Sequence, residues 1–109
     1  MPYYEEVESN VGISGAHENL SQLPDSVFLP AMPMSCGELL LRDSAMTKMK
    51  RTITIGRVAV LTKPLNCRQS CHYCGPCNRG CITSSYFNSV TTTIPDALKT
   101  GRLTLLTTL

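Results

Sequence analysis

The chain has 109 residues, of which 42% are hydrophobic and 17% charged, and its formal net charge is +2. This length limits it to one domain with a modest core. No run of about 20 apolar residues occurs, which excludes a membrane-spanning helix, and the acidic first residues are unlike a secretory signal peptide. The basic residues are scattered without interleaved aromatic residues, so we expect no nucleic-acid partner.

The N-terminal third predicts one short helix followed by a long loop. Residues 3–11 suit a helix because Pro2 fits its first position and Glu5 favours its positive end. Gly12 is the expected stop. Residues 12–33 predict an irregular loop, since prolines and glycines recur there too often for a regular pattern.

A second helix is predicted from about residue 36 to residue 50. Ser35 and Glu38 have the spacing of a capping box, in which each side chain bonds to the backbone of the other residue. Leu39, Met46 and Met49 fall on one face, which we expect to be buried. The methionines at 32, 34, 46 and 49 are interpreted as gap-filling core residues, and Cys36 as a small buried apolar residue.

The second half predicts strands and one more helix. Residues 53–60 predict a strand interrupted at Gly56, and residues 82–93 a loop or an edge strand. Residues 95–100 suit a short helix that stops at Gly101, and residues 103–109 a buried strand. Because a buried strand needs neighbours on both sides, we expect a piece of a larger protein. The fold class is α/β (an α+β fragment), with 1–109 as a single partial domain of short helices, a few strands and long loops.

A cysteine-rich loop at 67–81 is the most informative feature of the sequence. Cys71, Cys74, Cys77 and Cys81 have the spacing C-x2-C-x2-C-x3-C. Bacterial ferredoxins bind an iron–sulfur cluster with this spacing, because short gaps let successive thiolates converge on one point. Gly75 and Gly80 are expected to supply the tight turns. These four cysteines are therefore the candidate metal ligands.

Alternatives remain for the thiols. Disulfides and free thiols are less favoured than a metal, since five of the six cysteines are clustered within residues 67–81 rather than spread along the chain. Zinc is the main alternative to an iron–sulfur cluster, although zinc sites usually separate two C-x2-C pairs by a longer spacer. Ile82 stands where ferredoxin loops usually have proline, which weakens the iron–sulfur reading.

Other residues near the loop have weaker functional interpretations. Cys67 is either a spare ligand, a disulfide partner or a chance replacement of glycine, and His72 either a ligand or a solvated loop residue. His17 has no assigned role. Three arginines flank the loop and either moderate its negative charge, dock an electron acceptor or are ordinary exposed residues: Arg57, Arg68 and Arg79.

Several segments in the same order and spacing resemble an internal part of the glucose-methanol-choline oxidoreductases. The branch they resemble contains bacterial gluconate-dehydrogenase-like flavoproteins with a cysteine loop. The resemblance covers nearly the whole chain and is strongest around 57–66 and 71–101. It rests on residues 2–8, 11–15, 23–30, 56–66, 71–81 and 94–105.

The resemblance implies a fragment of an FAD-dependent oxidoreductase that acts on the CH–OH group of an alcohol or sugar. In that family a hydride passes to the flavin while a histidine near the C-terminal end takes the hydroxyl proton. In members with a cysteine loop an iron–sulfur cluster would relay electrons singly to a cytochrome or quinone. The partner of this chain would be the remainder of the parent flavoenzyme, which is either cytoplasmic or membrane-associated in the periplasm.

Departures from the family pattern limit what this chain can do alone. It contains no G-x-G-x-x-G fingerprint, and neither His17 nor His72 matches the family's catalytic histidine. Cys67 and Arg68 stand where relatives usually have Gly-Arg. We therefore expect no catalytic residue and no complete FAD site in the isolated chain. The alternative hypothesis is a small independent electron-transfer module that binds an iron–sulfur cluster or zinc.

Overall fold

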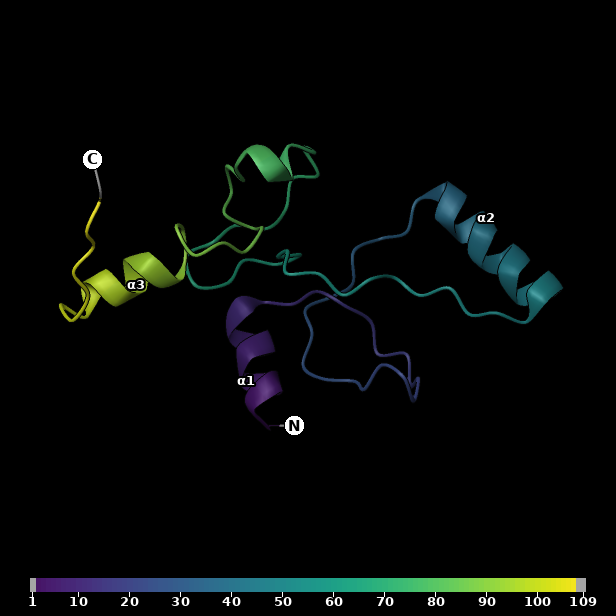
Figure 1. Ribbon diagram of the computed structural model, residues 1–109. Coiled ribbons are helices and arrows are strands. Elements are labelled where there is room, and N and C mark those ends of the chain that lie inside the picture. The colour runs from purple at the N-terminus through teal and green to yellow at the C-terminus, as the bar shows by residue number, and fades with distance from the viewer. Residues whose placement is uncertain (1, 108–109) are drawn as a thin grey trace.

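The computed structural model describes residues 2–107, which form three α-helices joined by long irregular segments (Figure 1). The helices are α1 (Pro2–Val11), α2 (Cys36–Ser44) and α3 (Thr93–Lys99). A π-helical turn, η1 (Ala45–Met49), continues α2, and a 3-10 turn, η2 (Cys77–Arg79), lies in the cysteine loop. No helix within residues 2–107 is long and apolar enough to cross a membrane.

Helix α1 confirms the prediction for the N-terminal segment. Pro2 is its first residue, and Gly12 follows its last residue with φ +80°. The N–H groups of Gly12 and Ile13 both donate to the carbonyl of Glu8, at 2.9 and 3.1 Å. A positive φ costs glycine little, and this explains why the helix stops there.

The capping box of α2 is confirmed, but the burial predicted for this helix is wrong. The Ser35 hydroxyl accepts from the N–H of Glu38 at 3.4 Å, and the Glu38 carboxylate accepts from the N–H of Ser35 at 2.6 Å. The helix projects from the rest of the chain (Figure 1), so Leu39, Met46 and Met49 are exposed. Cys36 is exposed too, because no other segment packs against the start of α2.

The strand predicted at 53–60 is absent, and single bridging pairs replace it. Ser14 pairs with both Leu29 and Val58, and Val60 pairs with Tyr86. Residues 51–57 run from the projecting α2 back to the centre without a neighbouring segment to pair with along their length (Figure 1). An extended segment becomes a strand only where another segment satisfies its backbone groups.

The prediction of a buried strand at 103–109 is also wrong for residues 103–107, which are the part of it that the structure describes. Residues 102–107 follow α3 as an exposed irregular segment, and residues 108–109 of the predicted strand lie outside the described residues. Of the two alternatives predicted for 82–93, a loop or an edge strand, the structure has a loop over 82–92, and the helix expected at 95–100 begins two residues earlier as α3. The α/β class itself stays a prediction.

The buried interior is small: Val60 and Leu61 lie where the central segments cross, while Ala45 is buried locally at the start of η1. The buried apolar residues of the described chain are Ala45, Val60 and Leu61, and Leu61 is fully buried. The accessible surface is 8451 Å², whereas a compact protein of this mass exposes roughly 5,900 Å². The radius of gyration is 17.3 Å, against roughly 13 Å for a compact domain of this length. The chain therefore leaves much apolar surface uncovered.

Candidate metal centre

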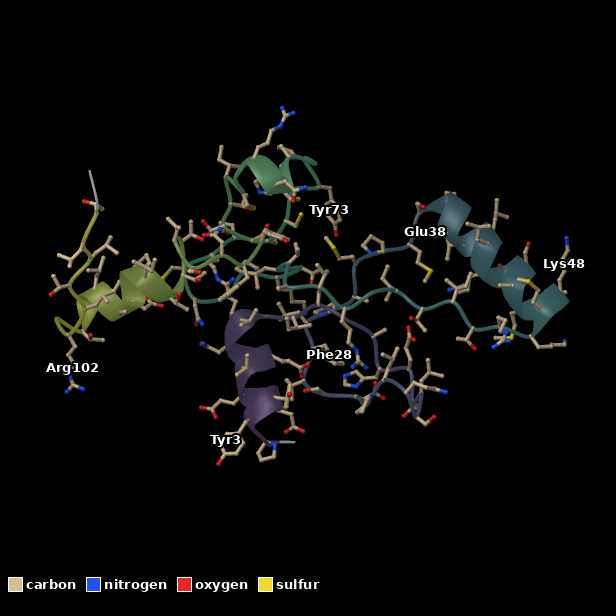
Figure 2. All side chains as sticks on the ribbon, viewed as in Figure 1. Tyr3, Phe28, Glu38, Lys48, Tyr73 and Arg102 are labelled. Atoms are coloured by element: carbon tan, nitrogen blue, oxygen red, sulfur yellow. The ribbon has the colours of Figure 1, made fainter. Side chains whose placement is uncertain are left out.

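The four predicted ligands lie around one cavity. A cavity of about 270 Å³ is lined by Cys71, Cys74, Cys77 and Cys81. It lies in residues 71–81 of the cysteine-rich loop, and this narrower segment is called the cysteine loop below. Figure 2 shows this loop standing out from the body of the chain, with Tyr73 at its edge. Their thiols are free, as are those of Cys36 and Cys67. The structure thus places the sequence-predicted residues together.

Both ends of the cysteine loop are tied to the same buried residue. The carbonyl of Leu61 accepts a hydrogen bond from the N–H of Cys71 at 2.8 Å, and its own N–H donates to the carbonyl of Ser85 at 3.0 Å. Just before the loop, the N–H of Gln69 donates to the carbonyl of Thr83 at 3.2 Å. These bonds close the loop at its base, next to Leu61.

Tight turns inside the loop follow the glycines, as the sequence predicts. Gly75 and Gly80 have φ values of +89° and +116°, and Tyr73 also has a positive φ, +56°. The N–H of Cys77 donates to the carbonyl of Gly75 at 2.8 Å, and η2 follows. The chain therefore reverses twice between Cys71 and Cys81, and this reversal brings distant thiols to one cavity.

Cys81 has the most polar surroundings of the four thiols. Its sulfur lies 3.2 Å from the Ser85 hydroxyl and 3.3 Å from the Thr83 hydroxyl, and it accepts from the N–H of Tyr86 at 3.5 Å. Hydrogen bonds from Ser85, then Thr83 and Tyr86, lower the pKa of Cys81 to about 6. Donors aimed at sulfur stabilise the thiolate, which is the form that binds metals.

The hydroxyl protons around Cys81 can be assigned by counting them. The Thr83 hydroxyl lies 3.1 Å from that of Ser85 as well as 3.3 Å from the sulfur, and it has one proton to donate. If Thr83 donates to Ser85, then Ser85 donates to the sulfur, and both hydroxyls are satisfied. Ser85, with only 1% of its surface exposed, is therefore the principal donor to the thiolate.

The other three thiols are less constrained. The sulfur of Cys71 accepts from the N–H of Tyr73 at 3.3 Å, while Cys74 is exposed and Cys77 half-buried. Residues 2–107 contain no group of three His, Cys, Asp or Glu side chains gathered closely enough to hold a single metal ion. The four cysteines share the lining of one cavity without forming such a group.

The remaining sequence candidates are distributed as follows. His72 is exposed and lines the cavity of the cysteine loop, so both of its readings stay open. Cys67 is exposed and lines a different cavity, beside Arg68. His17 lies far from the loop along the chain, with its ring centroid 5.5 Å from that of Phe28.

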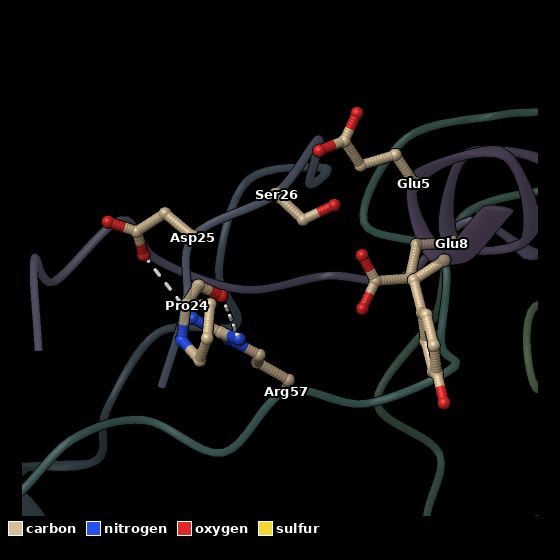
Figure 3. Close-up of a pocket in the computed structure, with 7 residues that line it drawn as sticks. Glu5, Glu8, Pro24, Asp25, Ser26 and Arg57 are labelled. Carbon is tan, nitrogen blue, oxygen red and sulfur yellow. Dashed lines mark hydrogen bonds and ion pairs between the residues drawn. The ribbon is translucent and has the colours of Figure 1, made fainter. Parts of the chain in front are cut away.

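The three arginines have three different environments. Arg79 is exposed at the end of η2. Arg57 donates to the carbonyls of Pro24 and Leu23 at 2.7 and 3.1 Å and to the Asp25 carboxylate at 3.3 Å. Its guanidinium also stacks 4.5 Å above the Phe28 ring, and together with Asp25 it lines a cavity of about 240 Å³ beside α1 (Figure 3). Arg57 therefore organises the loop at 23–28 rather than the thiols.

Arg68 contradicts the simplest sequence reading, that of an exposed arginine. Only 6% of its surface is exposed, and its Nη2 donates to the carbonyl of Val11, at the end of α1, at 2.6 Å. A cation suits the negative end of a helix. Burial lowers the pKa of the Arg68 guanidinium, which nevertheless stays charged at neutral pH.

Sequence reasoning missed two kinds of residue. Ser85 and Thr83 lie in the segment predicted as a loop or an edge strand, with no role assigned, although their hydroxyls contact the sulfur of Cys81. A serine or threonine two to four residues after the last cysteine is the signal that could have identified them. The buried position of Arg68 has no local sequence signal, since it depends on α1 and on Phe87, whose ring lies 5.8 Å from the guanidinium carbon.

Comparison with known proteins adds no relative to this description. No family model, no curated protein and no solved structure matches the chain.

Proposed function

We propose that this chain is an interior part of an FAD-dependent oxidoreductase of the glucose-methanol-choline type, acting on the CH–OH group of an alcohol or sugar. In this proposal Cys71, Cys74, Cys77 and Cys81 bind an iron–sulfur cluster. The single observation that carries the metal assignment is the cavity that all four cysteines line. FAD, held mainly by the rest of the parent protein, would accept a hydride, and the cluster would pass electrons singly to a cytochrome or quinone.

The exposed apolar surface supports the idea that the chain is completed by other segments. Leu40 and Leu41 on α2 expose 71% and 64% of their surface, and Leu106 exposes 86%. Monomeric proteins seldom leave so many large apolar side chains uncovered. In the proposal, the remainder of the flavoenzyme covers them.

In this proposal the base of the cysteine loop is fixed before a metal binds, whereas the outer turns of the loop can still move. Leu61 fixes the base of the loop, and Ser85 holds Cys81 as a thiolate before any metal arrives. Cys74 and Cys77, on the outer turns, can then move onto the metal without disturbing the buried residues. Tyr73 lies at the edge of the loop and can cover a bound cluster from water (Figure 2).

Anaerobic reconstitution with iron and sulfide tests the metal assignment. We expect iron and acid-labile sulfide in about equal amounts, with a broad visible absorption that reduction bleaches. Cys77→Ser should lose most of this cluster. Cys36→Ser is the matched control, because Cys36 is exposed outside the loop, and it should keep the full amount. Equal incorporation in the two variants, or a preference for zinc, would refute an iron–sulfur site on this loop.

The flavoenzyme assignment has its own test in the coding DNA on either side of this segment. We expect an upstream frame with a strand followed by G-x-G-x-x-G and a downstream frame that ends in a histidine-bearing segment. The absence of both over several hundred codons would remove the flavoenzyme proposal and leave the metal site untouched.

A small independent electron-transfer module is the second candidate, and the closed base of the loop favours it. The bonds of Leu61 to Cys71 and Ser85 need no residue from outside this chain. A purified chain that binds a stoichiometric cluster without flavin, and unfolds cooperatively as a monomer, would support the module over the fragment.

A further inference from the structure

A second cavity, separate from the cysteine loop, surrounds the buried arginine. It has a volume of about 160 Å³ and lies between α1, the turn at 65–68, the segment 84–87 and α3. Several water molecules would fill this volume, at roughly 30 Å³ each. The side chains that argue for its chemistry are Asn66, Arg68, Ser84, Asp96 and Lys99.

The guanidinium of Arg68, which lines this cavity, has only part of its hydrogen-bonding capacity satisfied. Its Nη2 donates to the carbonyl of Val11, but its Nη1 is buried and has no hydrogen-bond partner within residues 2–107. The ion pairs found in that part of the chain join other residues, so no carboxylate neutralises this cation. A buried cation that is not neutralised by a carboxylate is destabilising, and a cavity beside it favours an anion.

The neighbouring side chains are donors suited to a phosphate group. The Ser84 hydroxyl and the Asn66 amide line the cavity and form no side-chain hydrogen bond with the described residues, and both can donate. The planar guanidinium binds phosphate with two parallel hydrogen bonds. A phosphate has oxygens on all sides and can use donors from several directions, whereas a carboxylate has only two oxygens in one plane.

Asp96 is the one carboxylate in the lining and opposes an anion, but its charge is balanced. Lys99 lies 2.8 Å from it, and both side chains are largely exposed, at 70% and 77%. Water screens exposed charges strongly, so Asp96 repels an anion at Arg68 only weakly. Lys99 can also turn from Asp96 toward an anion, because an exposed ion pair contributes little stability.

We propose that the cavity at Arg68 binds a phosphate group, either as free inorganic phosphate or as the phosphate of a nucleotide. The Arg68 guanidinium supplies the positive charge, and the Ser84 hydroxyl and the Asn66 amide are the principal donors. The proposal concerns a site that shares no residue with the cysteine cavity, and it does not depend on the flavoenzyme assignment.

Binding of inorganic phosphate and of adenosine monophosphate to the full chain tests the proposal, by phosphorus NMR and calorimetry at constant ionic strength in chloride. We expect saturable binding of at least one probe, weakened about tenfold or more in Arg68→Gln, since the positive charge that lines the cavity is lost. Arg102→Gln is the matched control, because Arg102 is exposed outside this cavity and its loss should change affinity less than about twofold.

A second variant decides the matter if Arg68→Gln disturbs the fold. Ser84→Ala removes a hydroxyl without burying a new group and should weaken phosphate about threefold to tenfold, with an unchanged circular dichroism spectrum. Tighter binding of the nucleotide than of phosphate would assign the site to a nucleotide, and equal binding to phosphate itself. No saturable binding of either probe, or equal losses in Ser84→Ala and Arg102→Gln, would overturn the proposal.

Discussion

The hydroxyl of Ser85 lies 3.2 Å from the sulfur of Cys81, and this buried serine is also bonded through its carbonyl to the N–H of Leu61. One residue therefore links the thiol of Cys81, whose pKa is lowered, to the fully buried side chain of Leu61. The charge state of Cys81 and the packing of Leu61 are consequently coupled through Ser85.

In the metal-free chain, alkylation of Cys81 should follow a pH profile with its midpoint near the lowered pKa of about 6. Ser85→Ala should raise that pKa by about one to two pH units, the equivalent of a hydrogen bond to a charged group. Peptide-resolved mass spectrometry after brief iodoacetamide treatment measures it. Ser89→Ala is the control, because Ser89 is exposed and its side chain does not contact the sulfur; an equal shift in both variants would contradict the assignment.

The same lowered pKa makes stability depend on pH in a definite direction. The thiolate is favoured in the folded chain, so its contribution is fully present above the ordinary thiol pKa of 9.0 and is lost as pH falls through about 6. The Cys71 amide should therefore become less protected against hydrogen exchange as the pH is lowered from 9.0 to about 6, after correction for intrinsic rates. The Ser85→Ala variant should show a weaker dependence over this range.

Leu61→Ala should open the base of the cysteine loop. Removing a fully buried leucine side chain costs about 2–5 kcal/mol, because it leaves a cavity and loses apolar burial. We expect reduced hydrogen-exchange protection at Cys71, whose N–H donates to the Leu61 carbonyl. Leu40→Ala, on the exposed face of α2, should change the protection of the Cys71 amide by less than about 0.5 kcal/mol. Unchanged protection in Leu61→Ala would show that Leu61 does not support the loop.

Gly12→Ala should destabilise the centre of the chain by at least about 2 kcal/mol, since the residue has φ +80° and a side chain there is strained. An added Cβ would overlap the Leu61 side chain and lie 2.8 Å from Cδ2 of Leu65. Gly37→Ala is the contrast, because it has open space around it inside α2 and should stabilise the helix by about 0.5–1 kcal/mol. Thermal unfolding followed by circular dichroism measures both, and a milder effect at Gly12 than at Gly37 would contradict this packing.

Ser35→Ala should fray the start of α2 by about 1 kcal/mol, because an N-cap hydroxyl is lost. Hydrogen bonds from Ser35 lower the pKa of Glu38, so the cap is fully formed above the ordinary value of 4.5 and weakens as pH falls below it. Amide exchange within residues 37–40 is the measurement. Ser44→Ala, at a serine without a side-chain cap bond, should leave these amides within about 0.5 kcal/mol of the parent chain.

The sequence by itself determined the local features. The capping box at Ser35 and Glu38, the helix stop at Gly12 and the turns at Gly75 and Gly80 were predicted correctly, because each depends on residues a few positions apart. The cysteine spacing likewise predicted a group of thiols, since short gaps limit how far apart the sulfurs can lie.

Only the tertiary structure decided which residues are buried. The apolar pattern at 53–60 predicted a strand, but this segment meets other segments only at single bridging pairs. The pattern of α2 predicted a buried face, but no other segment covers it, so Leu39 and Met49 remain exposed. Conversely, Arg68 and Ser85 are polar residues for which the sequence predicted no burial, and both are buried. Burial depends on contacts between segments far apart in the chain, such as Arg68 with Val11, and a local pattern does not contain that information.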